Sequence, residues 1–476
     1  MKFGICVASS FVLLTALACS KAPSTETIET VTPESVEKIV ETIDPTVKKL
    51  IDASLKSTHA YDITESLTTE IGPRLAGSEA EARARKWAEE KFLALGFSNV
   101  KTEAFVIEGW ERGIESAAIV SPYPQQLYVT SLGGSVATPE AGITAPVAFF
   151  ESFEALKNAP EGGLDGKIVY ITGKMEKAIN GAGYGPANMK RRSGATEAAK
   201  RGAVAVLIRS VGTDSHRFPH TGQMRYGDEK KIPIGAVSAP DADQLDRIFA
   251  SGKDVEISLT MTPKAVGQQT SGNVVGEIVG SEKPEEIIVI GAHLDSWDLG
   301  TGAIDDGTGV GIVMGAAKVL MESGLKPKRT IRVVLFGSEE VGLLGARAYA
   351  EQHANELDQH FVATESDFGA ERVYSIQAGA GDANINLTKE MAPHFKSLGI
   401  EFVEGVTTGG PDIIPMAAAG VPAIRLNQDG TDYFELHHTP DDTFDKIDPD
   451  AMAQNVAAYT IFIWLASETD KKFREE

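Results

Sequence analysis

The sequence predicts an α/β protein in which helices flank a mixed, mostly parallel sheet, with a smaller β-rich domain inserted into the chain. Apolar runs alternate with helical segments after residue 270, as a sheet built from strand-helix units requires. These runs are continuous, which is typical of parallel strands buried on both faces. The middle of the chain differs in texture, because its β-rich runs are short and are separated by Gly and Pro turns.

The first 18 residues have the pattern of a signal peptide. A short positive region is followed by an almost wholly apolar stretch, Phe3 to Leu17, that is too short to span a bilayer. The letters LTALAC, residues 14–19, resemble a bacterial lipoprotein box, although alanine stands where leucine is usual three places before the cysteine. We therefore expect Cys19 to be lipid-modified in an exported protein. Ser20 after that cysteine favours the outer membrane of the cell envelope, and the anchor would be the only contact with the membrane.

A tether and the first part of the main domain follow. Residues 19–40 are rich in Thr, Glu and Pro, a composition that does not support a packed core. Residues 41–124 are expected to begin the main domain, with a helical stretch that is broken near Pro45. Residues 79–95 carry an apolar stripe at helical spacing, and Gly96 is expected to end that helix.

Residues 125–268 are expected to form the inserted domain. Its β-rich runs include PVAFF, KIVYIT and AVAVLI, and one helix-like segment, SGATEAAKRGA, leads directly into a strand. None of the clusters of metal-binding residue types falls in this region.

Residues 269–476 are expected to complete the main domain. Strands are predicted for EIIVIGA, TIRVVLF, HFVATES, VYSIQ and PAIRL, with helices at about 307–323, 342–353 and 385–397.

The composition restricts which kinds of partner and which metal-binding residue types are expected. The 476 residues carry a formal net charge of −22, so the chain repels phosphate backbones and nucleic acid is not expected as a partner. The two cysteines, Cys6 and Cys19, both lie in the first twenty residues. Any metal must therefore be held by His, Asp or Glu.

Two motifs early in residues 269–476 contain His, Asp or Glu in positions that suit a metal ligand. His293 stands where an apolar strand ends, and Asp295 follows two residues later, where its carboxylate can accept a hydrogen bond from the imidazole. Asp305 and Asp306 lie among glycines at a predicted helix start, so either can face a ligand. Each motif alone fits a structural histidine or an N-capping aspartate equally well.

Three further motifs complete the set. Glu339 and Glu340 follow a buried strand directly, where paired carboxylates are costly unless cations lie beside them. Asp367 follows the next strand, and His437 and His438 stand close to the C-terminus. Three successive strands thus end in a metal-competent residue, and carboxylates and imidazoles suit zinc or a related pair of divalent ions.

The order of these motifs resembles the M28 family of co-catalytic zinc exopeptidases over about residues 270–460. The resemblance implies the zinc-dependent exopeptidase fold, two zinc ions per subunit, and an inserted protease-associated domain. In it Asp305 would bridge the metals, with His293 and Asp367 on one and Glu340 and His438 on the other. The choices of Asp305 over Asp306 and of His438 over His437 rest on position within the motifs. Glu339 would be the general base, Asp295 would orient His293, and His437 would stabilise the oxyanion.

The resemblance also implies a substrate class. The segments GAHLDSWDLGTGAIDDGTG and YFELHHTPDDT are most similar to the carboxypeptidase branch of the family, so we expect hydrolysis of dipeptides or short peptides. An aminopeptidase of the same family is the alternative. A homodimer is implied by relatives of this branch.

Overall fold

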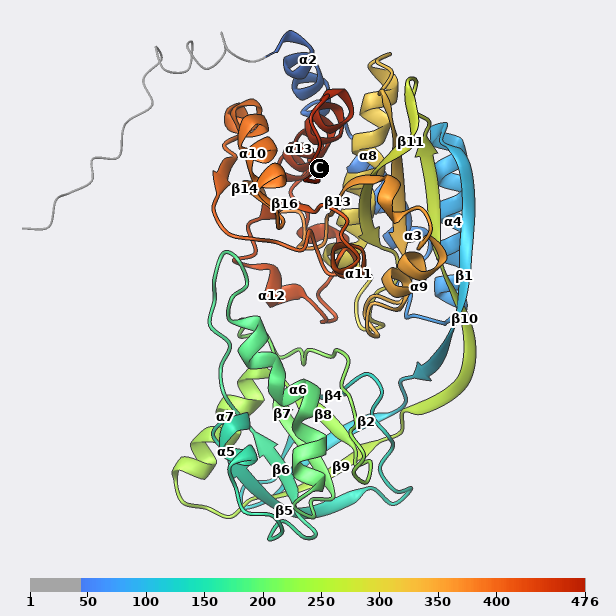
Figure 1. Ribbon diagram of the computed structural model, residues 1–476. Coiled ribbons are helices and arrows are strands. Elements are labelled where there is room, and N and C mark those ends of the chain that lie inside the picture. Colours follow the sequence, from blue (N-terminus) through green and yellow to red (C-terminus); the bar gives the residue numbers. More distant parts are fainter. Residues whose placement is uncertain (1–43, 476) are drawn as a thin grey trace, which may run out of the picture. The chain divides into compact units, whose positions relative to one another are not determined.

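The computed structural model describes residues 44–475 (Figure 1). The predicted signal peptide, the predicted lipidation site Cys19 and the predicted tether of residues 19–40 lie outside the described residues. Within residues 44–475, no helix has both the length and the apolar character needed to cross a membrane.

The main domain is built on a five-stranded sheet in the order β1-β10-β12-β11-β13. Its strands are β1 (Ser98–Glu111), β10 (Lys264–Ile278), β11 (Lys283–His293), β12 (Arg329–Phe336) and β13 (His360–Glu365). β11 pairs parallel with both β12 and β13, whereas β10 pairs antiparallel with β12 and with β1. Only β10 therefore runs against the other strands, so the prediction of a mixed, mostly parallel sheet is confirmed.

Helices cover both faces of this sheet because its strands are apolar on both sides. In β11, Ile288 and Ile290 belong to the core beneath α4, α8 and α13, whereas Ile287 and Val289 belong to the core beneath α9 and α11. The helices of the main domain are α2 (Pro45–Ser54), α3 (His59–Glu70), α4 (Glu79–Leu95), α8 (Thr308–Glu322), α9 (Leu344–Gln352), α10 (Asp382–Met391), α11 (Ile414–Ala418), α12 (Tyr433–Leu436) and α13 (Pro449–Glu468). Its short irregular helices are η1 (Ala303–Gly307), η2 (Leu357–Gln359), η3 (Ala392–Leu398) and η4 (Phe444–Lys446).

A three-stranded sheet lies beside β13. It has the order β15-β14-β16 and comprises β14 (Val373–Ala378), β15 (Glu401–Val403) and β16 (Ile424–Gln428). An isolated parallel bridge between Ala363 and Ala423 connects it to the main sheet.

A separate eight-stranded sheet occupies the middle of the chain, in the order β3-β2-β9-β5-β6-β7-β8-β4. Its strands are β2 (Glu115–Ser121), β3 (Gln125–Leu127), β4 (Val129–Ser131), β5 (Ile143–Phe150), β6 (Ile168–Ile171), β7 (Ala205–Arg209), β8 (Ile234–Val237) and β9 (Glu256–Met261). Its helices are α5 (Phe153–Lys157), α6 (Tyr184–Ala199) and α7 (Ala239–Ala250). β1 and β10, which lie side by side, lead into and out of this region (Figure 1). The domain limits 125 and 268, and the protease-associated identity, stay predictions.

Local signals account for most helix limits. Ser78 caps α4 by accepting a hydrogen bond from the Glu81 N–H at 3.1 Å, and Gly96 ends the helix with a φ of 95°. The helix expected at 385–397 is instead divided into α10 and η3, because Pro393 supplies no N–H for the α-helical ladder. The segment 193–203 also differs from expectation, since α6 begins at Tyr184 and ends at Ala199.

Candidate metal centre

The carboxyl ends of three adjacent strands bring the predicted residues together. His293 is the last residue of β11, the middle strand of the three, and it pairs in register with Phe336 at the end of β12. Glu339 and Glu340 follow β12 after a short turn, and Asp367 follows β13. Because β11 pairs parallel with both neighbours, these side chains converge at one edge of the sheet.

Asp305 lies between two histidines. Its Oδ1 is 3.1 Å from Nε2 of His293, and its Oδ2 is 3.3 Å from Nε2 of His438. Asp306 is used differently, because its carboxylate accepts the backbone N–H groups of His293 and Gly309, each at 3.1 Å. Asp305 therefore has the position of a shared carboxylate, while Asp306 holds the turn together.

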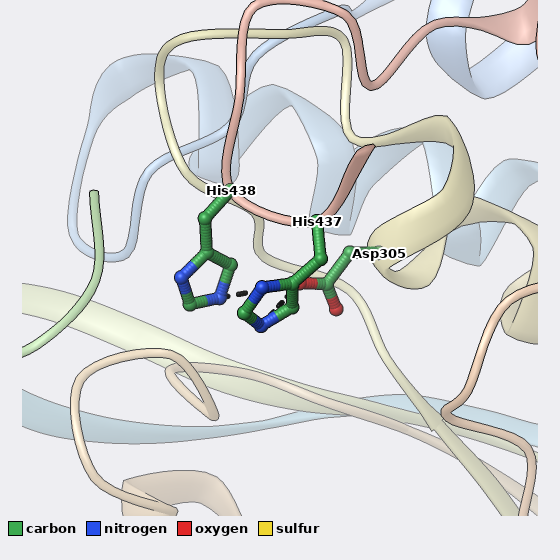
Figure 2. A group of neighbouring side chains, drawn as sticks. All are labelled: Asp305, His437 and His438. Atoms are coloured by element: carbon green, nitrogen blue, oxygen red, sulfur yellow. Dashed lines mark ion pairs between the residues drawn. The ribbon is translucent and has the colours of Figure 1, made fainter. Parts of the chain in front are cut away.

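His437 and His438 both face this carboxylate from the loop after α12 (Figure 2). Nε2 of His438 lies 3.0 Å from Oε2 of Glu340, whereas Nε2 of His437 lies 3.8 Å from Oδ2 of Asp305. The two imidazole rings are stacked, with centroids 3.4 Å apart. Of the two histidines, His438 is thus the better placed to bind the same metal ion as Glu340.

Asp295 differs from expectation. Nδ1 of His293 lies 2.9 Å from the backbone carbonyl oxygen of Asp295 but 3.8 Å from its carboxylate. The carboxylate instead accepts the Glu339 N–H at 3.0 Å, so the backbone of Asp295 fixes the imidazole and its side chain fixes the turn that carries Glu339. Burial raises the pKa of Asp295 to about 7.

Burial and mutual repulsion dominate the electrostatics of the site. Desolvation raises the pKa of Asp367 to about 6, and the neighbouring Asp305 carboxylate adds to that shift. Desolvation, reinforced by Asp367 and Glu340, also raises the pKa of Glu339 well above its usual range. Burial acts on Asp305 in the same direction, but hydrogen bonds from His293 and His438 hold its pKa well below its usual range.

These residues fit a pair of divalent cations. Three groups have ligand atoms within 4.8 Å of one another: Asp305, His437 and His438; His293, Asp305 and Glu340; and His293, Asp306 and Asp367. Asp305 belongs to two of these groups, and Oε1 of the buried Glu340 has no hydrogen-bond partner among the described residues. Cations at these positions would offset the repulsion between the carboxylates. Glu339 belongs to none of the three groups.

Two further residues that stabilise the site were not predicted from the sequence. Asp442 is buried, and its carboxylate accepts the backbone N–H groups of Ile304 at 2.6 Å and Asp305 at 3.3 Å. Asp442 therefore supports the backbone of the turn that carries Asp305. Arg74 is fully buried and donates to the carbonyl oxygens of Leu294 and Gly302, at 2.5 and 2.8 Å. No local pattern in the sequence indicates either role, because both side chains act on backbone groups that only the fold brings near.

A cleft of about 720 Å³ opens onto the site and is lined by both parts of the chain. The acidic residues in its lining are Asp305, Glu339, Glu340 and Asp367. The basic residues in its lining other than histidine are Arg191, Arg192, Arg225 and Arg425. Asp305, Glu340 and Asp367 belong to the candidate ligand groups and Glu339 lies beside them, so the charge in the rest of the lining is positive.

Comparison with known proteins agrees with this geometry. The profile of Peptidase family M28 matches residues 273–461, the segment that carries the converging side chains. Mouse carboxypeptidase Q is 33% identical over 464 residues, which cover 96% of this chain and 97% of the mouse protein.

Solved structures give the same result. The crystal structure of a peptidase M28 precursor from Shewanella amazonensis SB2B has a TM-score of 0.89 and 47% identity, covering 90% of this chain and 97% of that one. A zinc aminopeptidase from Bacillus subtilis shares the fold with a TM-score of 0.61 and 23% identity, covering 85% of this chain and 94% of that one. Full-length similarity and the matched segment together show that the chain belongs to peptidase family M28.

Proposed function

We propose that this protein is a di-zinc exopeptidase that removes the C-terminal residue from dipeptides or short peptides. The observation that carries the proposal is the position of Asp305, whose two oxygens lie beside His293 on one side and His438 on the other. A carboxylate in that position can bridge two metal ions. The name carboxypeptidase Q for the mouse relative and the zinc in the Bacillus subtilis aminopeptidase agree with this reaction and this metal.

The ligands divide into two sets around Asp305. Oδ1 of Asp367 lies 3.8 Å from Nε2 of His293, which supports these two residues as ligands of one zinc ion. The contact of 3.0 Å between Glu340 and His438 supports them as ligands of the other. Asp305 would then complete both sets, which gives each ion three protein ligands and leaves room for water and substrate.

The chain itself contributes a base and a hydrogen-bond donor to the reaction. Bound zinc ions polarise the peptide carbonyl and lower the pKa of water. Glu339 lines the cleft, is held by its N–H bond to Asp295, and is free of the metal-ligand groups, so its carboxylate can accept the proton of the attacking water and return it to the leaving amine. His437 also lines the cleft, and its Nε2 lies 3.8 Å from Oδ2 of Asp305, so this nitrogen can donate a hydrogen bond to the developing oxyanion.

The charges in the cleft support recognition of a free carboxylate. An exopeptidase must bind a charged chain end, and arginine binds carboxylates through paired N–H groups. Arg225 lies beside the turn that carries Glu339 and Glu340. Its Nη2 is 3.6 Å from the point that a Cβ atom would occupy if Gly342 had a side chain. That is the side on which Glu339 would protonate the leaving amine, so the C-terminal carboxylate of the substrate would meet Arg225.

A dipeptide panel tests both parts of the proposal. Dipeptides with a blocked N-terminus should still be cleaved, those with an amidated C-terminus should not, and the purified protein should contain two zinc ions. Arg225→Gln should raise KM for unblocked dipeptides about tenfold with little change in kcat, because one charge-assisted contact is lost. Arg83→Gln, on the exposed side of α4, is the control. Cleavage of amidated but not N-blocked peptides would instead establish an aminopeptidase.

Two further inferences concern the N-terminus of the protein and its oligomeric state. We infer that Cys19 is lipid-modified and anchors an exported protein in the cell envelope, and that two copies associate as a homodimer. The lipoprotein box at residues 14–19 supports the first inference. Normal processing at Cys19 in globomycin-treated cells would contradict it, and a monomer in sedimentation equilibrium would contradict the second.

A further inference from the structure

A segment of the middle region, residues 213–222, is hydrogen-bonded to the loop that carries His437 and His438. The Thr213 N–H donates to the carbonyl oxygen of Phe434 at 3.1 Å, and the Thr221 N–H donates to that of His438 at 3.1 Å. Nδ1 of His220 lies 2.8 Å from the carbonyl oxygen of His437. These contacts join residues that are more than 200 positions apart in the sequence.

His220 is itself held by a buried carboxylate. Its Nε2 lies 2.7 Å from Oδ1 of Asp214, and the two side chains are 0% and 1% exposed. The backbone N–H of His220 also donates to Oγ of Ser210, at 2.9 Å. Asp214 therefore fixes the imidazole so that Nδ1 points at the His437 carbonyl, in the way that carboxylates orient histidines beside metal sites.

Thr221 contacts the His438 imidazole directly. Nδ1 of His438 lies 3.2 Å from the Thr221 carbonyl oxygen, which also lies 3.4 Å from Nη1 of Arg191. Nδ1 of His438 also lies 3.4 Å from Nη1 of Arg191, which only donates, but its contact with the Thr221 carbonyl oxygen is shorter. A carbonyl oxygen only accepts hydrogen bonds, so this shorter contact favours a proton on Nδ1 of His438. Nε2, which faces Asp305 and Glu340, is then the nitrogen with the free lone pair, as a metal ligand requires.

The close approach depends on Gly222. Its φ is +128°, and a Cβ there would lie 2.4 Å from Nη1 of Arg191 and 2.8 Å from Nδ1 of His438. His438 has a φ of 64°, a left-handed conformation that few side chains adopt without support from neighbouring contacts. The backbone conformations of Gly222 and His438 therefore both allow the two segments to pack closely at this point.

We propose that His220 and Asp214 are positioning residues that hold the His437–His438 loop so that Nε2 of His438 faces the metal centre. The middle region thereby completes a metal site to which it contributes no ligand. The inference rests on the proposed function only in taking His438 as a zinc ligand.

Zinc affinity of the full-length protein, measured by competition with a chromophoric chelator, tests this proposal. His220→Leu should weaken the binding of one zinc ion about 10- to 100-fold, the effect expected when an orienting partner of a metal ligand is lost. His220→Asn should restore part of that affinity, because its amide can still donate to the His437 carbonyl. His360→Leu is the matched control, since His360 is also fully buried and contacts Tyr349 and Glu356, away from the site.

The outcomes separate the two proposals. Wild-type affinity in His220→Leu, or an equal loss in His360→Leu, would overturn the positioning role. If His220→Leu does not fold, Asp214→Asn and Gly222→Ala give the same test, and wild-type zinc affinity in both would overturn it. A wild-type protein that binds no zinc would contradict the proposed function instead.

Discussion

At the residue scale, two consecutive glutamates acquire different roles from their contacts. Oε2 of Glu340 lies 3.0 Å from His438, whereas Glu339 is held through its backbone by Asp295 and presents its carboxylate to the cleft. The sequence shows only a pair of acids after a strand. The structure distinguishes a candidate ligand from a candidate base, because only one of the two carboxylates contacts an imidazole.

Substitution of each glutamate should separate these roles. Glu339→Gln should keep two zinc ions while kcat falls about 100- to 10,000-fold, the range for loss of a general acid-base group. Glu340→Gln should lose part of its zinc as well as its activity. Metal analysis and dipeptide hydrolysis on the same preparations measure both effects. Substantial turnover by a metal-replete Glu339→Gln variant would be incompatible with its role as the base.

At the scale of elements, α9 and the start of β13 share a buried hydrogen-bond chain. Nη1 of Arg332 lies 2.9 Å from the Tyr349 hydroxyl, which lies 2.9 Å from Nε2 of His360. Nδ1 of His360 lies 3.0 Å from the carbonyl oxygen of Glu356. Since Nδ1–H donates to that carbonyl, a neutral His360 accepts from Tyr349 at Nε2. Protonation would reverse this bond and would bury a positive charge close to Arg332.

This chain predicts acid sensitivity. Burial lowers the pKa of His360 from 6.5 to about 4. Between these values the unfolded chain binds a proton that the folded chain does not, so stability is full above pH 6.5 and falls as the pH decreases toward 4. The loss should reach about 3 kcal/mol. Urea unfolding from pH 7 to 4.5, with chelator present, should show a smaller pH dependence for His360→Gln; equal slopes for both proteins would contradict the prediction.

Sequence patterns predicted the elements better than the contacts between them. His293, Glu339 and Asp367 could be placed because each follows an apolar run that is recognisable as a buried strand. His220 and Asp442 could not, because each acts on backbone groups brought near only by the fold, and a polar residue in a loop has no local pattern that reveals such a partner. Neighbouring alternatives such as Asp305 and Asp306 also needed the structure, since both satisfy the same motif.

At the scale of the molecule, the main domain and the middle region share one functional cleft. The carboxylates come from the main domain, whereas Arg191, Arg192 and Arg225 come from the middle region. A chain with a net charge of −22 thus places positive charge opposite its most crowded carboxylates. This arrangement can guide an anionic substrate end past an otherwise repulsive surface.

The same crowding makes the stability of the whole protein depend on its metals. Buried carboxylates that repel one another favour unfolding, and a cation that binds only the folded state reverses this by mass action. Removing zinc with a chelator should therefore lower Tm, and zinc at 100 times its dissociation constant should restore about 2.7 kcal/mol per site. His438→Ala should respond less than wild type, because one ligand set is incomplete, whereas Arg83→Gln should respond as wild type does. Calorimetric scans across a zinc titration measure the effect, and a Tm that does not change between chelator and excess zinc would show that the carboxylate cluster is stable without cations.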